Sequence, residues 1–387
     1  MHQLARRSTV LIALVTVALG PTASLAGAAE PHLKPTPKSG AAEPHPKPTP
    51  KVAVIGTGGT IAGVSKSKVS FDDYEAGKLP VSRLVRDLRP DVDRIAAVTT
   101  QQFGNKDSNN YSIPEYRRLT ATVDHALKYN DGVVVTTGTD TMEEFAYWLD
   151  LTVRSDKPVV LTGAMRPWTV IGSDAPANLY NAIHLAASGR TTCFGTVVML
   201  NDEIHAAREV RKTDALRLNA FSSGSSGELG VIDQNHIRVN RAPARAEQCG
   251  KSGWKTPFDL GRIARRPLPE VEIAYSYQGA GPEAIKAFAD AGAAGVVTAG
   301  TGAGGISPAM TEARDDAVKN GVLFASASRT GSGAVYDPHV RGVIGAEDLT
   351  PQKARLLLLL SLATTHNEHR IQKWFDTLGT AQFRPRR

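Results

Sequence analysis

After Lys51, short apolar runs alternate along the chain with stretches in which apolar residues recur at helical spacing. Five runs read as strands buried on both faces: Val52–Gly56, Ile95–Thr100, Val133–Thr137, Val159–Thr162 and Thr196–Leu200. The helical stretches between them are Leu79–Leu88, Ile113–Lys128, Thr141–Val153 and Ala175–Ala187. Such a series of strands and helices predicts a mostly parallel sheet that is covered on both faces.

A second series of the same kind follows an irregular stretch, Ala242–Pro269, which is rich in Arg, Gly and Pro. Its strands are Val271–Tyr275, Gly295–Ala299 and Leu323–Ser328, and its helices are Pro282–Ala291, Pro308–Gly321 and Pro351–Thr365. We therefore expect an α/β protein with two doubly wound, mostly parallel sheet domains. The larger, flavodoxin-like domain would span 51–243 and the smaller one 270–387, with a linker at 244–269. A chain of 387 residues is long enough for two such cores.

The first 50 residues have a different pattern. Arg6 and Arg7 precede an apolar run, Val10–Gly20, and small residues that allow cleavage after Ala26 or Ala28, so residues 1–28 read as a secretory signal peptide. The arginine pair leaves the twin-arginine route open, although general secretion is favoured. Residues 29–50 repeat a Pro- and Lys-rich motif and predict a disordered tether, whose two histidines are more simply spacer than metal ligands.

Composition excludes several classes of protein. The net charge is +7; residues 1–50 hold five Lys/Arg and two Asp/Glu, hence +3, which leaves +4 for the rest. No basic stripe with interleaved aromatics suggests nucleic-acid binding. No apolar run after the leader is long enough to span a membrane, so no stable membrane association is expected. Histidine spacing predicts no metal site, and no cofactor is expected. Cys193 and Cys249 suit an exported protein if they pair, but the sequence leaves their pairing open.

Candidate chemistry lies at two strand ends. The run Val52–Gly63 ends in a glycine turn that carries Thr57 and Thr60, and Thr136–Glu144 reads TTGTDTMEE. Open α/β sheets place their chemistry at such carboxyl ends. Two hydroxyl-rich strand ends, one with an acid, indicate a threonine-based hydrolase more than a nucleotide site. The GTGAGG of Gly300–Gly305 fits a dinucleotide motif, but no acid ends the next strand, where Ala327 and Ser328 stand.

The sequence resembles the bacterial-type L-asparaginases, and its leader suggests the exported type II enzymes. The likeness runs through TGGTIA (57–62), GTDTMEE (138–144), GAMRP (163–167), NLYNA (178–182), the lysine of REVRKTD (208–214) and TPQKAR (350–355). It covers most of residues 51–387 in order. There are departures: Thr137 stands where the second motif usually has His, and Ser155 stands near a position of the disulfide found in some enterobacterial relatives.

The resemblance implies an amidohydrolase that converts L-asparagine and water to L-aspartate and ammonia. It makes Thr60 the nucleophile, assisted by Tyr74 of a mobile lid, and it makes Thr139, Lys212 and Asp140 a triad. Ser108 and Asn109 would hold the backbone groups of the substrate, although Asn109 replaces the more usual Gln or Glu. From the residues alone, the threonines could instead be helix caps, Tyr74 a loop aromatic and Lys212 a surface cation. Which group acts as the base stays open.

The resemblance also implies a homotetramer, a dimer of intimate dimers in which the C-terminal domain of one subunit completes the site of its neighbour. Gly305 stands where relatives carry Asn or Ser, and Thr330–Val340 offers no clear match for a glutamate that relatives supply from that neighbour. Two alternatives remain. One is a glutaminase-asparaginase with comparable activity on glutamine. The other is a non-catalytic periplasmic amino-acid receptor, which would not need Thr60 or Lys212.

Overall fold

The structure is a computed structural model that describes residues 48–263 and 267–378. The predicted signal peptide and nearly all of the Pro/Lys-rich tail lie outside the described residues. Within those residues, no helix has both the length and the apolar character needed to cross a membrane.

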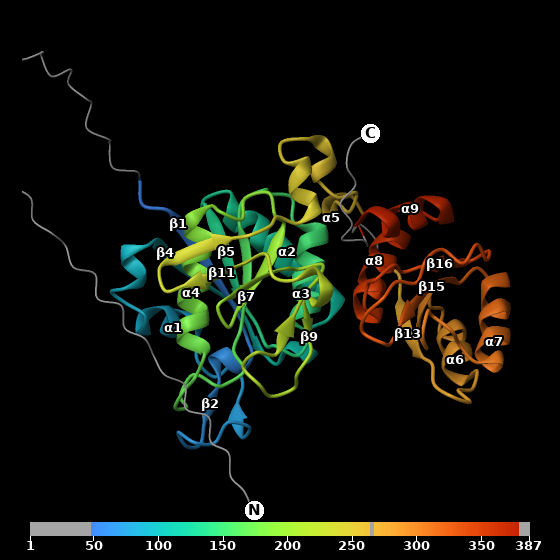
Figure 1. The fold of residues 1–387 in the computed structure, drawn as a ribbon, viewed down its shortest axis with the longest axis horizontal. Helices are drawn as coiled ribbons and strands as arrows, with labels where there is room; N and C mark the ends of the chain where they lie inside the picture. The colour runs from blue at the N-terminus through green and yellow to red at the C-terminus, as the bar shows by residue number, and fades with distance from the viewer. Residues whose placement is uncertain (1–47, 264–266, 379–387) are drawn as a thin grey trace, which may run out of the picture. The chain divides into compact units, whose positions relative to one another are not determined.

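The larger sheet has eight strands, in the order β12-β11-β8-β7-β6-β5-β1-β4 (Figure 1). Its parallel part consists of β4 (Ala97–Lys106), β1 (Lys51–Gly58), β5 (Gly132–Thr136), β6 (Val159–Thr162) and β7 (Thr196–Leu200). Three antiparallel strands extend it beyond β7: β8 (Glu203–Ala206), β11 (Gly230–Asp233) and β12 (His236–Val239).

Strand β1 lies next to the edge strand β4, between β4 and β5, and all of its residues after Lys51 are buried. Its side chains alternate between two cores. Val52 and Val54 pack with α1 (Val81–Asp87) and α4 (Ala175–Ser188), whereas Ala53 and Ile55 pack with α2 (Ile113–Leu127) and α3 (Met142–Thr152). Figure 1 shows these two helix pairs on opposite faces of the sheet. A strand with apolar side chains on both faces is thereby fully covered, as its continuous apolar run predicts.

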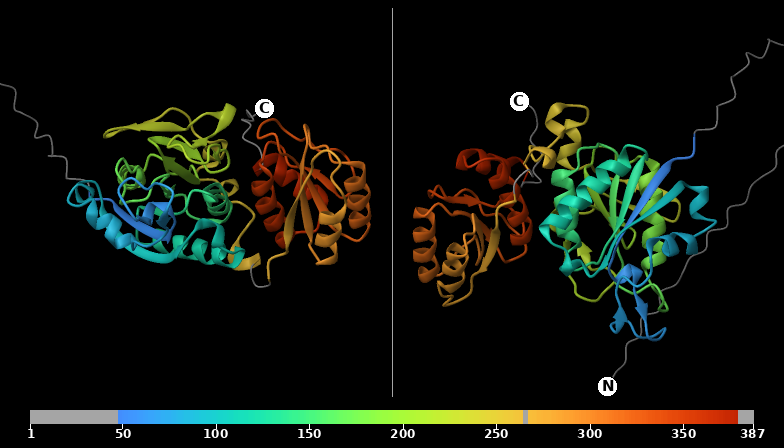
Figure 2. Two further views of the ribbon diagram at one scale, coloured as in Figure 1. Left: turned by 90° about the horizontal axis from the view of Figure 1, so that it is seen from below. Right: turned by 180° about the vertical axis from the view of Figure 1, so that it is seen from behind.

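The smaller sheet has four parallel strands in sequence order: β13 (Val271–Tyr275), β14 (Gly295–Gly300), β15 (Leu323–Ser328) and β16 (Val343–Gly345). Helices α6 (Glu283–Asp290) and α7 (Pro308–Lys319) pack on one face, and α8 (Pro351–Thr364) and α9 (Glu368–Leu378) pack on the other (Figure 2). The predicted fold class, two mostly parallel sheets with a larger N-terminal one, is therefore confirmed.

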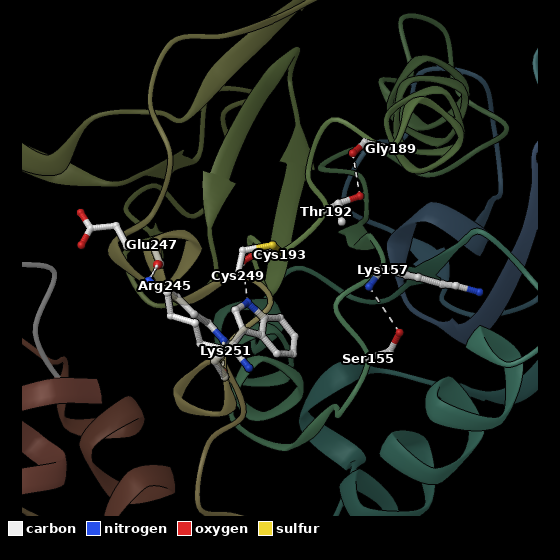
Figure 3. Close-up of a disulfide and its surroundings, with 10 residues drawn as sticks. Ser155, Lys157, Gly189, Thr192, Cys193, Arg245, Glu247, Cys249 and Lys251 are labelled. Carbon is white, nitrogen blue, oxygen red and sulfur yellow. Dashed lines mark hydrogen bonds between the residues drawn. A yellow bond between two sulfur atoms is a disulfide. The ribbon is translucent and has the colours of Figure 1, made fainter.

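The segment predicted as an irregular linker contains three short helices, η5 (Ala244–Gln248), η6 (Ser252–Trp254) and α5 (Leu260–Ile263). Cys249 in this segment forms a disulfide with Cys193, a pairing that the sequence left open (Figure 3). The indole of Trp254 donates a hydrogen bond of 2.8 Å to the Cys193 carbonyl, and Arg245 lies over the Trp254 ring at 4.1 Å. The disulfide and these contacts hold the segment against the larger sheet domain.

Candidate active site

Thr60 lies in a turn that only glycine allows. Gly58 and Gly59 at the end of β1 have φ of 106° and 78°, which side-chain-bearing residues rarely adopt. A Cβ on Gly59 would lie 2.2 Å from the backbone nitrogen of Gly138, so the two strand-end loops pack backbone against backbone. Thr60 then opens a 3-10 helix, Thr60–Ala62, and is itself buried.

The hydroxyl of Thr60 forms a hydrogen bond of 2.7 Å with the phenol of Tyr74. Thr60 makes no capping bond, so the helix-cap alternative does not describe it. Tyr74 belongs to a hairpin of β2 (Val64–Ser65) and β3 (Tyr74–Glu75). Two hydrogen bonds of 2.9 Å, Ile171 N–H to the Lys68 carbonyl and Ser65 N–H to Thr169 Oγ1, join the hairpin to a neighbouring loop. The hairpin thereby places the Tyr74 hydroxyl at Thr60.

Burial raises the pKa of Tyr74, and the nearby carboxylates of Asp140 and Asp107 raise it further, whereas the bond to Thr60 lowers it. The net direction is upward, so the phenol keeps its proton at neutral pH. Because its phenol already carries a proton, Tyr74 can take the Thr60 proton only while it passes its own proton to another group.

A second group of side chains meets at the end of β5. The ammonium of Lys212 donates hydrogen bonds to Thr139 Oγ1 at 2.9 Å and to Asp140 Oδ1 at 2.6 Å. Thr139 is buried, and the Lys212 side chain is only 15% exposed. Lys212 lies on β9 (Arg211–Lys212), which pairs with β10 (Phe221–Ser222), 72 residues from Asp140 in the sequence. Lys212 is therefore a partly buried partner of the strand-end loop and not a free surface cation.

Ser108 and Asn109 come from a third segment, a 3-10 helix at Ser108–Asn110 after β4. The buried Ser108 hydroxyl accepts a hydrogen bond of 3.3 Å from the Thr141 backbone N–H, and the exposed Asn109 amide donates one of 3.4 Å to Asp140 Oδ2. All seven predicted site residues thus lie around two strand ends. Thr60 and Tyr74 form one cluster, and the other five, Asp140 among them, lie around the loop that follows β5.

Two supporting residues were not predicted. The buried Thr57 hydroxyl donates a 2.9 Å hydrogen bond to the Thr136 carbonyl, and Tyr111 donates one to the Thr57 carbonyl. The Thr57 hydroxyl joins the end of β1 to the end of β5, and Tyr111 joins the same turn to the segment that follows β4. The sequence shows Thr57 and Thr60 in the same glycine turn. It does not show that the Thr57 hydroxyl bonds to the Thr136 carbonyl whereas the Thr60 hydroxyl bonds to Tyr74. Thr137, at the position where the motif usually has His, is fully buried, and its hydroxyl has no hydrogen-bond partner among the described residues.

This arrangement is suited to acyl transfer. It offers a hydroxyl with a proton-carrying partner, a second hydroxyl beside an ammonium, and a glycine-rich backbone with uncovered N–H groups. Asp140 offers a carboxylate that can receive a substrate ammonium. No group of three or more His, Cys, Asp or Glu side chains within 48–263 and 267–378 is arranged to hold a metal ion.

The chain is similar to known proteins over most of its length. The family described as "Asparaginase, N-terminal" matches residues 51–245, and "Glutaminase/Asparaginase C-terminal domain" matches residues 270–375. L-asparaginase 2 of Bacillus subtilis is 40% identical over 84% of this chain and 86% of its own. A probable periplasmic L-asparaginase of Haemophilus influenzae is 37% identical, covering 84% and 92%.

Relatives named glutaminase-asparaginase occur in Pseudomonas fluorescens and Acinetobacter glutaminasificans. The solved structure of a probable cytoplasmic L-asparaginase from Campylobacter jejuni matches with a TM-score of 0.79 and 39% identity, over 84% of this chain and 99% of that one. With both family domains matched in order over most of its length, the chain belongs to the asparaginase family.

Proposed function

We propose that this protein hydrolyses the side-chain amide of L-asparagine to L-aspartate and ammonia through a threonine acyl-enzyme. The observation that carries the proposal is the Lys212 ammonium bonded to both Thr139 and Asp140, beside a turn that presents Thr60 to Tyr74. A protein that only binds an amino acid has no need of a partly buried lysine against a threonine hydroxyl. Membership of the asparaginase family supports the same substrate class.

In the first half-reaction the Thr60 hydroxyl oxygen attacks the side-chain amide carbon of asparagine, and the C=O π bond opens to an oxyanion. Backbone N–H groups near Thr60 and Thr139 would stabilise that charge. The hydroxyl proton leaves through Tyr74 or through the Thr139–Lys212–Asp140 group. The raised pKa of Tyr74 favours a relay, in which the phenol passes a proton on and does not hold a negative charge. The C–N bond then breaks, and the nitrogen takes up a proton and departs as ammonia.

In the second half-reaction water attacks the ester carbon, the C–O bond to Thr60 breaks, and one proton of the water returns to the Thr60 oxygen as aspartate is released. Asp140 would pair with the α-ammonium of the substrate, and Ser108 and Asn109 would hold its backbone groups. The Asn109 amide nitrogen already donates to Asp140 Oδ2 at 3.4 Å, so Asn109 lies beside the carboxylate proposed for the substrate ammonium.

Ammonia release from L-asparagine and from L-glutamine, each measured as kcat/KM on the purified protein, tests this proposal. Turnover of asparagine supports it. Tight binding of asparagine without ammonia release would identify an amino-acid receptor instead.

Export through the predicted signal peptide and assembly into a homotetramer belong to the proposal as well. Export rests on the leader pattern of residues 1–28, on the periplasmic relative and on the disulfide, which an oxidising compartment sustains. Size-exclusion chromatography with light scattering measures the assembly, and N-terminal sequencing of the exported protein measures the cleavage site.

Deletion of residues 27–49 is expected to leave kcat and the melting temperature unchanged, because a Pro/Lys-rich segment cannot bury a core. The cut is made before Pro50 because its carbonyl accepts a 2.8 Å bond from Ala97 N–H at the edge of the sheet. Activity assays and thermal melts of the shortened chain check this. Loss of the oligomer or of activity would show that the tail is structural.

A strong preference for asparagine is expected, with glutaminase activity of about a few per cent or less. Gly305 offers no side chain to a neighbouring subunit's site, and one lost charge-assisted hydrogen bond costs about 1.5–3 kcal/mol. The extra methylene of glutamine changes the free-energy difference between the two substrates by only about 1–3 kcal/mol. The missing anchor should therefore penalise glutamine more, since asparagine reaches Thr60 with less adjustment.

The variant Gly305→Ser tests the cause of this preference. The backbone at Gly305 needs no positive φ, and a Cβ there would lie 3.3 Å from the Thr301 hydroxyl, so a small side chain requires Thr301 to shift by a few tenths of an ångström. Its kcat/KM for glutamine should rise relative to asparagine. Equal kcat/KM for the two amides in the unmodified protein would contradict the predicted preference.

A further inference from the structure

Lys353 is a lysine with 1% exposure, which is rare for this residue type. It lies in the first turn of α8, in the smaller domain, and its ammonium donates to three backbone carbonyls of the larger domain. The distances are 3.0 Å to Ala207 and 3.1 Å to Arg208, and the third acceptor is Val210. An ammonium has three N–H donors, so the three carbonyls match its capacity.

These carbonyls belong to one tight turn that leads directly into the candidate site. The N–H groups of Glu209 and Val210 both bond to the Ala206 carbonyl at 3.0 Å, and the next carbonyls of the turn, beginning with Ala207, accept from Lys353. Lys212 comes two residues after Val210, and its ammonium donates hydrogen bonds to Thr139 and Asp140. The position of the Lys212 backbone therefore depends on a turn that Lys353 holds.

Gln352, the residue before Lys353, contacts the helix that follows Thr139 and Asp140. The Gln352 amide donates a 2.6 Å hydrogen bond to Glu143 Oε1, a buried carboxylate in the first turn of α3. Helix α3 begins at Met142, immediately after the loop with Thr139 and Asp140. Two consecutive residues of α8 thus contact both segments that meet at the Lys212 ammonium.

The surroundings of Lys353 keep it charged at neutral pH. Burial lowers its pKa to about 8, and the guanidinium groups of Arg208 and Arg211 act in the same direction. The carboxylates of Glu143 and Glu209 act against them. The Tyr147 ring lies 6.0 Å from the ammonium, and burial raises the pKa of that phenol, so it stays neutral. A cation at this site keeps all three donors.

We propose that Lys353 is a positioning residue for amide hydrolysis: through the Ala206–Val210 turn it sets where Lys212 meets Thr139. The inference rests on the proposed function, because it assigns Lys353 a role only through Lys212. The predicted site residues all lie in the larger domain. Lys353 adds to them a residue of α8, in the smaller domain of the same subunit.

Lys353→Met keeps the side-chain volume but removes the charge and all three donors. Its kcat is expected to fall by about 10- to 100-fold, since small misplacements of a catalytic group have effects of that size. KM should change by less than about threefold, because Asp140, Ser108 and Asn109 keep their places. A fall in melting temperature with an unchanged kcat would overturn the proposal.

Lys157→Met is the matched control. Lys157 also donates to two backbone carbonyls, those of Leu127 and Asn130, at 2.9 and 2.7 Å. It precedes the amino end of β6, in the surroundings of the disulfide drawn in Figure 3, whereas the candidate site follows the carboxyl ends of β1 and β5. Its loss should lower the melting temperature and leave kcat unchanged. A fall in kcat as large as that of Lys353→Met would mean that loss of stability alone explains both variants, and would overturn the proposal.

A double-mutant cycle separates positioning from a general structural role. If Lys353 acts through Lys212, adding Lys353→Met to Lys212→Ala should lower the residual turnover by less than about twofold. A further loss of tenfold or more would overturn the inference. Wild-type turnover in Lys212→Ala alone would instead overturn the proposed function, so the two failures are distinguishable.

Lys353→Gln covers the case in which Lys353→Met does not fold. Its shorter amide offers two donors and no charge, so its kcat should fall at least about fivefold, again without further loss in the Lys212→Ala background. A wild-type kcat in folded Lys353→Gln would contradict the proposal.

Discussion

Replacing Thr60 with alanine is expected to lower kcat for asparagine by roughly 10³-fold or more, because the substitution removes the attacking oxygen. KM should change little, since the groups proposed to bind substrate surround Asp140. The fold should survive: the variant loses one hydrogen bond, to Tyr74, which is worth about 1 kcal/mol. Steady-state ammonia release, together with a thermal melt, measures both expectations.

Two variants complete this test. Thr60→Ser keeps a hydroxyl and should retain part of the turnover. Thr152→Ala removes another buried threonine hydroxyl, one that bonds to the Trp148 carbonyl at 2.7 Å near the far end of α3, and it should leave kcat unchanged. Near-normal ammonia release from Thr60→Ala would refute the proposed nucleophile.

Thr139→Ala is expected to lower kcat by roughly 10³-fold as well, because the hydroxyl bonded to the Lys212 ammonium disappears from the site. Lys212→Met should have an effect of similar size. The two side chains share one hydrogen bond, so the double variant should be little worse than either single one. Full additivity of the two losses, measured as free energies from kcat, would show that Thr139 and Lys212 act separately.

The pattern of the chain predicted the parallel part of the fold well, because strands buried on both faces carry continuous apolar runs. Strands β6, β7, β13 and β15 have the predicted ends, and β1 and β5 differ by a few residues. The strands β8, β11, β12 and β16 and the helix α9 were not predicted. In β12, only Ile237 is buried and the second apolar residue, Val239, is partly exposed, so the strand is too short and too polar to give a clear apolar run. Strand β4 extends to Lys106, beyond the predicted Thr100, because its polar residues pair along β1.

The linker prediction shows a different limit. A segment rich in Arg, Gly and Pro has no periodic pattern, yet Trp254 and Phe258 within it are buried, and Cys249 is bonded to Cys193. Which cysteines meet depends on the path of the chain over 56 residues, and no local pattern encodes that path. The spans proposed for the two domains, 51–243 and 270–387, therefore stay predictions about where one folding unit ends.

By itself, the sequence determined the local chemistry of the site: glycine turns at two strand ends, Thr60 in one, Thr139 and Asp140 in the other. These features follow from backbone conformations and short-range pattern. Only the tertiary structure decided that Tyr74 meets Thr60 and that Lys212 meets Thr139, since both partners come from short hairpins with no signal of their own. It also decided that Lys353, which the sequence shows only as a cation ahead of a leucine run, holds the turn that leads to Lys212. The physical reason is that a buried ammonium must find carbonyl and carboxylate partners, and these come from segments far apart in the chain.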